Sequence, residues 1–206
     1  MCEHARAVSR STIIVLLALG ATFAGFVFAS NGRLRAGESD IAHTVAAGPQ
    51  TAVLHWRETY GDPGERLVFT VRSLEVTDSG WNARIGVENG TKVGWKLVPG
   101  AIPGGSFGLQ LFETGSKDEL DRRNRAGTLP IPRAATRFAP TLPRALEPGA
   151  SWDGTISASG PLVAGSWARV VFGTLVAVGK PPKGFGKQVV WITDHTHQLH
   201  LGEEST

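Results

Sequence analysis

The chain has 206 residues, of which 26 are glycine and 12 are proline, and its formal net charge at pH 7 is +3. This small charge argues against a nucleic-acid-binding protein, which would carry a pronounced basic patch for the phosphates. The single cysteine, Cys2, excludes an intramolecular disulfide, and we expect no cofactor. The fold must therefore be stable through its apolar core alone.

An apolar segment, residues 12–30, follows residues 1–11, which include Arg6 and Arg10. Its first 18 residues carry no charged side chain, and as a helix they would span about 27 Å, close to the ~30 Å of a membrane's hydrocarbon core. This length favours an uncleaved transmembrane anchor, but residues 27–29 would also suit cleavage of a secretory signal peptide. The arginines predict a cytoplasmic N-terminus. We expect a single-pass cell-membrane protein with an extracytoplasmic C-terminal part, or a secreted protein after cleavage.

The remaining chain is expected to form a linker, residues 31–50, and one all-β domain, residues 51–206. The linker is small and polar, without a sustained hydrophobic period. In the domain, short segments rich in β-branched residues alternate with turn-forming glycine and proline, and seven to nine strands predict a two-sheet sandwich. The strands are expected within residues 52–56, 67–78, 81–89, 91–98, 106–113, 146–158, 166–179 and 187–201.

The clearest strand is residues 81–89, where apolar and polar side chains alternate with the period of two that marks one buried face. Residues 91–98 repeat this alternation. Asn89-Gly90 between them is the pair that best forms a tight turn, so we expect the two segments to pair as a hairpin. With Thr91 the pair also matches a glycosylation sequon, which the turn explains without a glycan.

One insertion departs from the strand pattern. Ser116 and Glu119 have the spacing of a helical capping box, and Gly127 would end a short charged helix. The Pro-rich passage that follows must be irregular or lie at a sheet edge. Its prolines are Pro130, Pro132, Pro140 and Pro143.

The same insertion is the most basic part of the chain, with seven basic against three acidic residues between Lys117 and Arg144. An ordinary solvated face or loop is the favoured interpretation of this charge, and binding of an anionic partner in the cell envelope is the alternative. The candidate partner-binding residues are Arg122, Arg123 and Arg125.

Three pieces of sequence carry a resemblance. They are ARIGVENGTKVGWKL (83–97), SFGLQLFETG (106–115), and RALEPGASWDGTISASGPL (144–162) leading into ARVVFGTL (168–175). Over roughly residues 65–180 the chain resembles the immunoglobulin-like domain of unknown function found on Gram-positive and actinobacterial lipoproteins and membrane proteins. The resemblance implies a bacterial protein with an immunoglobulin-like β-sandwich, and it supplies no catalytic residues.

The stretch TDHTHQLHL, residues 193–201, contains three histidines. In a continuous strand His195 and His197 would share one face and could bind a metal ion, with His55 or a carboxylate as a third ligand, while His200 would point away. Because zinc normally takes three or four protein ligands, a polar strand end is the favoured interpretation and a metal site the alternative.

A G-x-S-x-G match at residues 104–108 centres on Ser106, and Asp153 and His195 or His197 follow in the chain order of a hydrolase triad. That motif requires a strand, a turn and then a helix, whereas a strand follows here. We therefore predict a non-enzymatic, membrane-anchored extracytoplasmic binding or accessory domain. The alternative is a metal-binding protein that uses His195 and His197, and a hydrolase is a weaker third.

Overall fold

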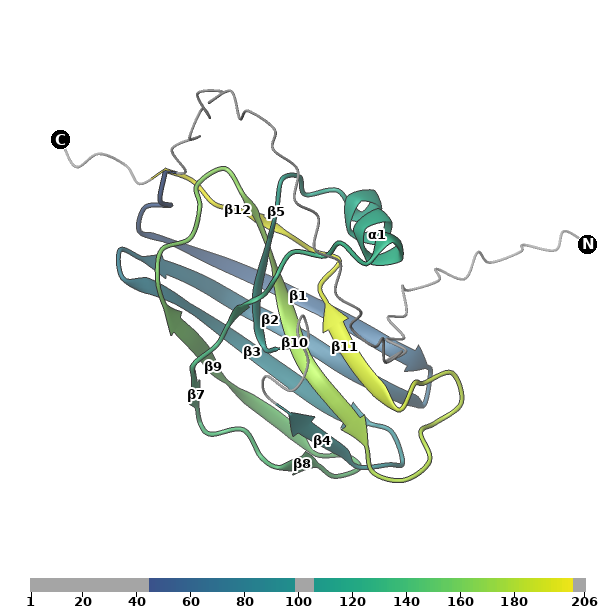
Figure 1. Ribbon diagram of the computed structural model, residues 1–206. Helices are drawn as coiled ribbons and strands as arrows, with labels where there is room; N and C mark the ends of the chain where they lie inside the picture. The colour runs from purple at the N-terminus through teal and green to yellow at the C-terminus, as the bar shows by residue number, and fades with distance from the viewer. Residues whose placement is uncertain (1–44, 99–105, 202–206) are drawn as a thin grey trace, which may run out of the picture.

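The computed structural model describes residues 45–98 and 106–201, in which two antiparallel β-sheets pack face to face with one helix against them (Figure 1). This confirms the predicted all-β sandwich with a short inserted helix. The predicted membrane segment, residues 12–30, lies outside the described residues, as do residues 1–11 and the linker up to residue 44. No helix within the described ranges is long and apolar enough to cross a membrane.

The first sheet begins with a long hairpin whose two strands are joined at Pro63-Gly64, where Gly64 adopts a φ of 98°. Its strand order is β1-β2-β3-β9-β7. The strands are β1 (Gln50–Asp62), β2 (Glu65–Thr77), β3 (Gly80–Gly90), β9 (Ser151–Ser159) and β7 (Arg137–Ala139).

The second sheet is built around β10 (Trp167–Ala177), which pairs with β5 and β4 along one edge and with β12 and β11 along the other. Two short strands, β6 and β8, extend it beyond β5 and β4. The remaining bounds are β4 (Trp95–Val98), β5 (Gly108–Phe112), β6 (Arg133–Ala134), β8 (Ala145–Leu146), β11 (Gln188–Ile192) and β12 (His197–Gln198). The described residues thus form more strands than predicted, because short edge pieces have no hydrophobic period of their own.

The core lies between the sheets, where the predicted period of two is confirmed. In β3 the side chains of Trp81, Ala83, Ile85 and Val87 are buried, whereas its charged side chains are exposed. Aromatic rings bridge the two layers: the ring of Phe69 stacks on Trp191 at 5.3 Å and lies 5.0 Å from Phe172. Ala47 also packs into this core and Ala46 bridges to Val163, so the sandwich starts a few residues before the predicted boundary at residue 51.

The predicted hairpin at Asn89-Gly90 is wrong. β3 pairs with β2 and β9, whereas β4 pairs with β10 and β8, so residues 91–94 carry the chain from one sheet to the other. Asn89 is fully buried at this crossover, and its Nδ2 donates to the carbonyl oxygens of Val93 (2.8 Å) and Leu146 (2.9 Å). Its Oδ1 accepts from the backbone N–H (3.0 Å) and hydroxyl (2.7 Å) of Thr91. The amide therefore holds the crossover and is not available for a glycan.

The inserted helix, α1 (Lys117–Ala126), is confirmed, with Ser116 as its N-cap and Gly127 in the left-handed C-cap conformation. The capping box is not reciprocal, because Glu119 accepts from the backbone N–H and hydroxyl of Thr114 and its other oxygen bonds Arg123. Leu120 of the helix packs against the outer face of the second sheet, where it forms a small apolar cluster with Phe112, Val171 and Ile192.

The Pro-rich passage lies at sheet edges, as predicted. It forms β6 at the edge of the second sheet and then β7 at the edge of the first, so it joins the two layers along one side. Backbone bonds from Ala135 N to Phe107 O (2.7 Å) and from Thr136 N to Ser157 O (2.8 Å) hold this connection. The opposite side of the sandwich is joined by side chains of β1, which reach the histidine-rich stretch.

Candidate functional site

The histidine-rich stretch is not the continuous strand predicted for residues 187–201. β11 ends at Ile192, residues 193–196 form a corner outside any strand, and β12 begins at His197. The predicted division of these residues between two strand faces is therefore wrong. The cause is a pair of buried charged side chains, Glu58 and Arg169, which bind the backbone of the corner from two sides.

Glu58 lies on β1 and its carboxylate is almost completely buried. One oxygen accepts hydrogen bonds from the indole N–H of Trp191 (2.7 Å) and the backbone N–H of Asp194 (3.0 Å). The other accepts from the backbone N–H (3.1 Å) and the ring Nδ1 (2.7 Å) of His195. Four donors thus satisfy the carboxylate, which compensates the loss of its hydration.

Arg169 lies on β10, on the outer face of the second sheet beneath α1, and its residue exposure is 0%. One guanidinium nitrogen donates to the carbonyl oxygens of Thr193 and Asp194, both at 2.6 Å. The other donates to the carbonyl oxygens of Gly115 (3.2 Å) and Ser116 (3.0 Å). Burial lowers the pKa of Arg169, and nearby carboxylates, Asp194 first, oppose this effect.

The two charges therefore hold one peptide segment between them: Glu58 binds its N–H groups and Arg169 binds its carbonyl groups. Arg169 also binds the residues just before α1, and Lys117 at the start of α1 forms an ion pair with Asp194 at 3.0 Å. This network joins β1, β10, the 193–196 corner and the start of α1. We refer to it as the Glu58–Arg169 network.

His195 is the part of this network that faces solvent, since 54% of its side chain is exposed. Its ring stacks on Trp56, with the centroids 5.7 Å apart and the planes at 21°. Glu58 engages Nδ1, so Nε2 is the ring nitrogen left for a ligand. Carboxylate-supported imidazoles of this kind serve as metal ligands and as general bases.

His197 has a different neighbour. Its ring lies 6.2 Å from that of His200 and nearly perpendicular to it, and burial, followed by the charge of His200, lowers the pKa of His197. Across residues 45–98 and 106–201 no group of three or more His, Cys, Asp or Glu side chains is placed to hold a metal ion. His55, considered as a third ligand, is exposed at a bulge of β1 with a φ of 50°.

The residues of the hydrolase match belong to different parts of the sandwich. Ser106 precedes β5 in the second sheet, whereas Asp153 lies on the outer face of the first sheet and pairs with Arg72. His195 bonds Glu58 rather than Asp153. The carboxylate–imidazole pair was missed because 137 residues separate its members. One sequence signal for the pair is Glu58, which lies between Trp56 and Tyr60. The strand alternation points its side chain inward, and a carboxylate there needs a partner.

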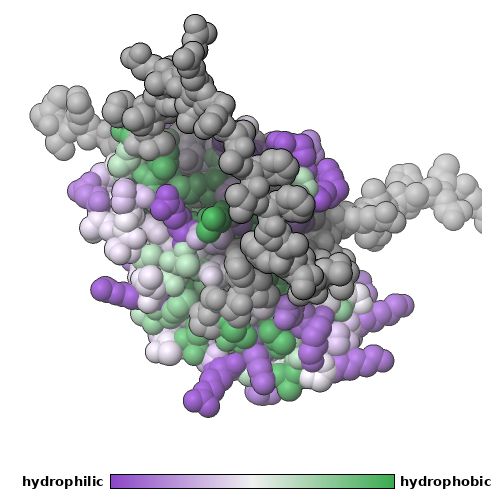
Figure 2. Space-filling view, viewed as in Figure 1, coloured by the Kyte–Doolittle hydropathy of each residue, from purple (hydrophilic) through white to green (hydrophobic). Residues whose placement is uncertain are grey.

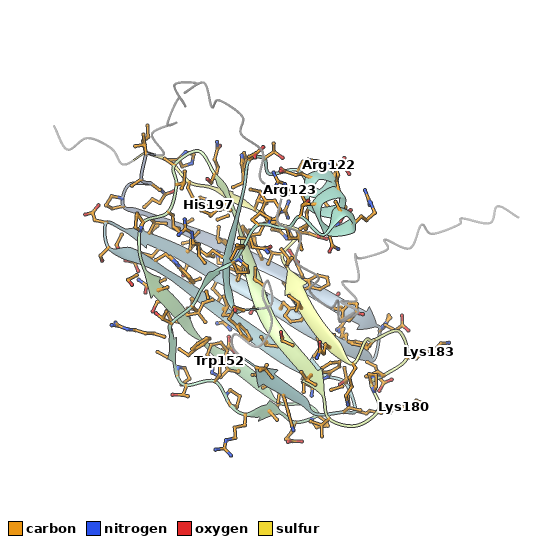
Figure 3. The ribbon with its side chains drawn as sticks, in the orientation of Figure 1. Arg122, Arg123, Trp152, Lys180, Lys183 and His197 are labelled. Carbon is orange, nitrogen blue, oxygen red and sulfur yellow. The ribbon has the colours of Figure 1, made fainter. Side chains whose placement is uncertain are left out.

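The basic helix is a second candidate surface, and its three predicted arginines differ in their contacts. Figure 3 labels two of them, Arg122 and Arg123, on α1. Arg123 forms ion pairs with two glutamates of the same chain: its Nε lies 2.8 Å from Glu119, and a terminal nitrogen lies 3.2 Å from Glu113. The hydrogen bond from Thr114, and then that from Arg123, lower the pKa of Glu119 despite its burial. Arg122 and Arg125 are exposed, and neither forms an ion pair with another described residue.

Hydrophilic side chains gather over α1 and around the loop between β10 and β11, which carries Lys180 and Lys183 (Figures 2 and 3). After α1, Ile131 is 88% exposed, next to the arginine of β6, Arg133. Four exposed residues of α1 and of the segment that follows it, Arg122, Arg125, Ile131 and Arg133, are together called the α1 platform below.

Comparison with known proteins found no matching family model, no matching curated protein and no matching solved structure. The functional interpretation therefore depends on the residues and geometry described above.

Proposed function

We propose that this chain is a non-enzymatic, extracytoplasmic binding domain, held at the cell membrane by residues 12–30, which recognises an acidic envelope partner through the α1 platform. The main support is the attachment of α1. The fully buried Arg169 donates to the carbonyl of Asp194 in the corner and to that of Ser116 just before the helix. Lys117 in the first turn of the helix also pairs with Asp194. This attachment fixes the start of α1 on the sandwich, so the exposed arginines of the helix are presented from a rigid base.

The chemistry of the α1 platform favours an acidic partner. Arg122 and Arg125 project from an ordered helix, and arginine binds carboxylates through two parallel hydrogen bonds. Ile131, four residues after the helix C-cap Gly127, adds an exposed apolar side chain. Because the helix is already fixed by the Glu58–Arg169 network, binding loses little conformational entropy, and rigid surfaces bind more tightly for this reason.

The proposed fold family is the immunoglobulin-like domain named above. Two of the motifs that carry the resemblance meet in the structure. Asn89, at the end of β3, donates to Leu146 O, and the N–H of Gly149, in the segment 144–162, donates to Asn89 O at 2.7 Å. These contacts give the motifs a shared structural role at the crossover between the sheets.

Charge reversal tests the binding proposal. Arg122→Glu combined with Arg125→Glu should leave the fold intact, because neither side chain bonds another described residue, and should abolish co-purification of the partner from crosslinked membranes. The matched control is Arg66→Glu with Arg84→Glu, which changes two exposed arginines on the outer face of the first sheet. Equal recovery of partners by both double variants and the parent would reject the α1 platform.

A metal-binding function at His195 is the second candidate, and the observation that favours it is the Glu58 hydrogen bond to Nδ1. Such a carboxylate fixes the tautomer that presents Nε2 to a metal ion. The test is elemental analysis of the purified chain. This function requires near-stoichiometric zinc or another transition metal in the parent and its loss in His195→Gln, and the same trace content in both would reject it.

A further inference from the structure

The outer face of the first sheet has a hollow of about 300 Å³ where β2, β3, β9 and β7 lie side by side. The volume is at the lower end of the range for small-molecule sites. The hollow lies above Gly80, where β3 runs very close to β9. A Cβ at this position would collide with the carbonyl oxygen of Ala158, so only glycine fits there.

The side chains around the hollow are mostly hydroxyl groups. Asn82, Ser157 and Arg137 are direct cross-strand partners, so they form one row across β3, β9 and β7 on the same face. Hydroxyl groups from the neighbouring positions complete the lining. They belong to Thr77, Ser79, Thr136 and Ser159. The aromatic residue of the lining, Trp81, is almost completely buried and points into the core.

Among the residues that the structure describes, Arg137 is the only one with a charged side chain that lines the hollow. It is exposed and makes no ion pair with any other described residue. The nearest acidic residue in the same cross-strand row is Glu75, which accepts from Asn82 Nδ2 at 3.2 Å. Glu75 is three strands away from Arg137, or about 14 Å at normal strand spacing. Asp78 is in the turn between β2 and β3 and is not part of the lining.

We propose that this hollow binds a tetrahedral oxyanion, namely a phosphate group, through Arg137 and the surrounding hydroxyl groups. The guanidinium fork matches two phosphate oxygens, and the hydroxyls of Ser157 and Ser159 can donate to the others. The hydroxyls of Thr77 and Thr136 donate to the carbonyl oxygens of Gly80 and Ser157 and shape the rim of the hollow. Among the described residues the lining offers a cation no carboxylate, and it offers an apolar ligand only the partly exposed Ala158. The site is on the first sheet and is independent of the α1 platform.

The phosphate could be free or esterified, and two probes distinguish these sources. The full-length chain in neutral detergent micelles is titrated into inorganic phosphate and, separately, into glycerol phosphate, with the phosphorus NMR linewidth as the signal. We expect broadening of at least one probe, with Arg137→Gln weakening the apparent affinity about tenfold or more. Broadening by inorganic phosphate alone assigns a free ion, and broadening by glycerol phosphate assigns a phosphomonoester.

The matched control is Arg66→Gln, an exposed arginine of β2 on the same face, near the opposite end of the sheet. It should bind as the parent does, and Arg137→Lys should keep part of the affinity. Unchanged tryptophan fluorescence will show that the variants are folded. The proposal is overturned if neither probe broadens, or if Arg137→Gln and Arg66→Gln bind as tightly as the parent.

Discussion

Replacing Arg169 with methionine tests the Glu58–Arg169 network, since it removes the guanidinium and keeps much of the apolar stem. Four carbonyl groups lose a donor, and the two at 2.6 Å, Thr193 and Asp194, matter most. Leaving a buried acceptor unsatisfied costs about 1–3 kcal/mol. The methionine variant no longer buries a charge, so the desolvation cost of the guanidinium disappears and offsets part of this loss. We therefore expect a loss of about 3 kcal/mol in the free energy of unfolding.

The assay is urea unfolding of the full-length chain in neutral detergent, followed by tryptophan fluorescence, because Trp167 and Trp191 lie near the network. At a typical dependence of about 1–3 kcal/mol per molar urea, the midpoint should fall by about 1–3 M. Arg66→Met, at an exposed position, is the control and should shift stability by less than about 0.5 kcal/mol. An Arg169→Met midpoint equal to that of this control would refute the reasoning.

Three further predictions concern the crossover and the corner. Asn89→Ala removes donations to the buried carbonyl of Leu146 and the partly buried carbonyl of Val93, and it should lower the free energy of unfolding by about 2–4 kcal/mol in the same urea assay. Glu58→Gln cannot accept all four hydrogen bonds, so the indole N–H resonance of Trp191 should shift in an amide NMR spectrum, and an unmoved resonance would contradict the bond. Burial lowers the pKa of His197, so the unfolded chain takes up this proton first and stability should fall as the pH drops below about 6.5. His197→Gln should reduce that slope in unfolding curves at pH 7.5 and 5.5, and an unchanged slope would assign the effect to other groups.

Local patterns in the sequence were sufficient for several elements. The alternation of β3 predicts its buried face because a strand places successive side chains on opposite sides. The short helix follows from Ser116 and Gly127, because capping depends on neighbouring residues. Of the two outcomes predicted for the Pro-rich passage, irregular backbone or a sheet edge, the structure shows edge strands, since proline cannot donate to an interior strand.

The elements that were mispredicted depend on contacts between distant residues. Asn89-Gly90 has the composition of a hairpin turn, but the carbonyl of Leu146, 57 residues away, binds the Asn89 amide and favours a crossover between sheets. The strand expected through residues 193–196 is interrupted by Glu58 and Arg169. Arg123 is indistinguishable from Arg122 in the sequence, and only the helix geometry shows that it faces Glu119.

Recognition through the α1 platform is tested most directly by photo-crosslinking in intact cells, with a photoreactive amino acid placed at Arg125 and, as a reference, at Arg66. The proposal predicts one dominant adduct from position 125 with an acidic envelope protein, which Arg122→Glu abolishes, and no such adduct from position 66. Equal labelling from both positions, or an adduct that persists in the Arg122→Glu background, would contradict it.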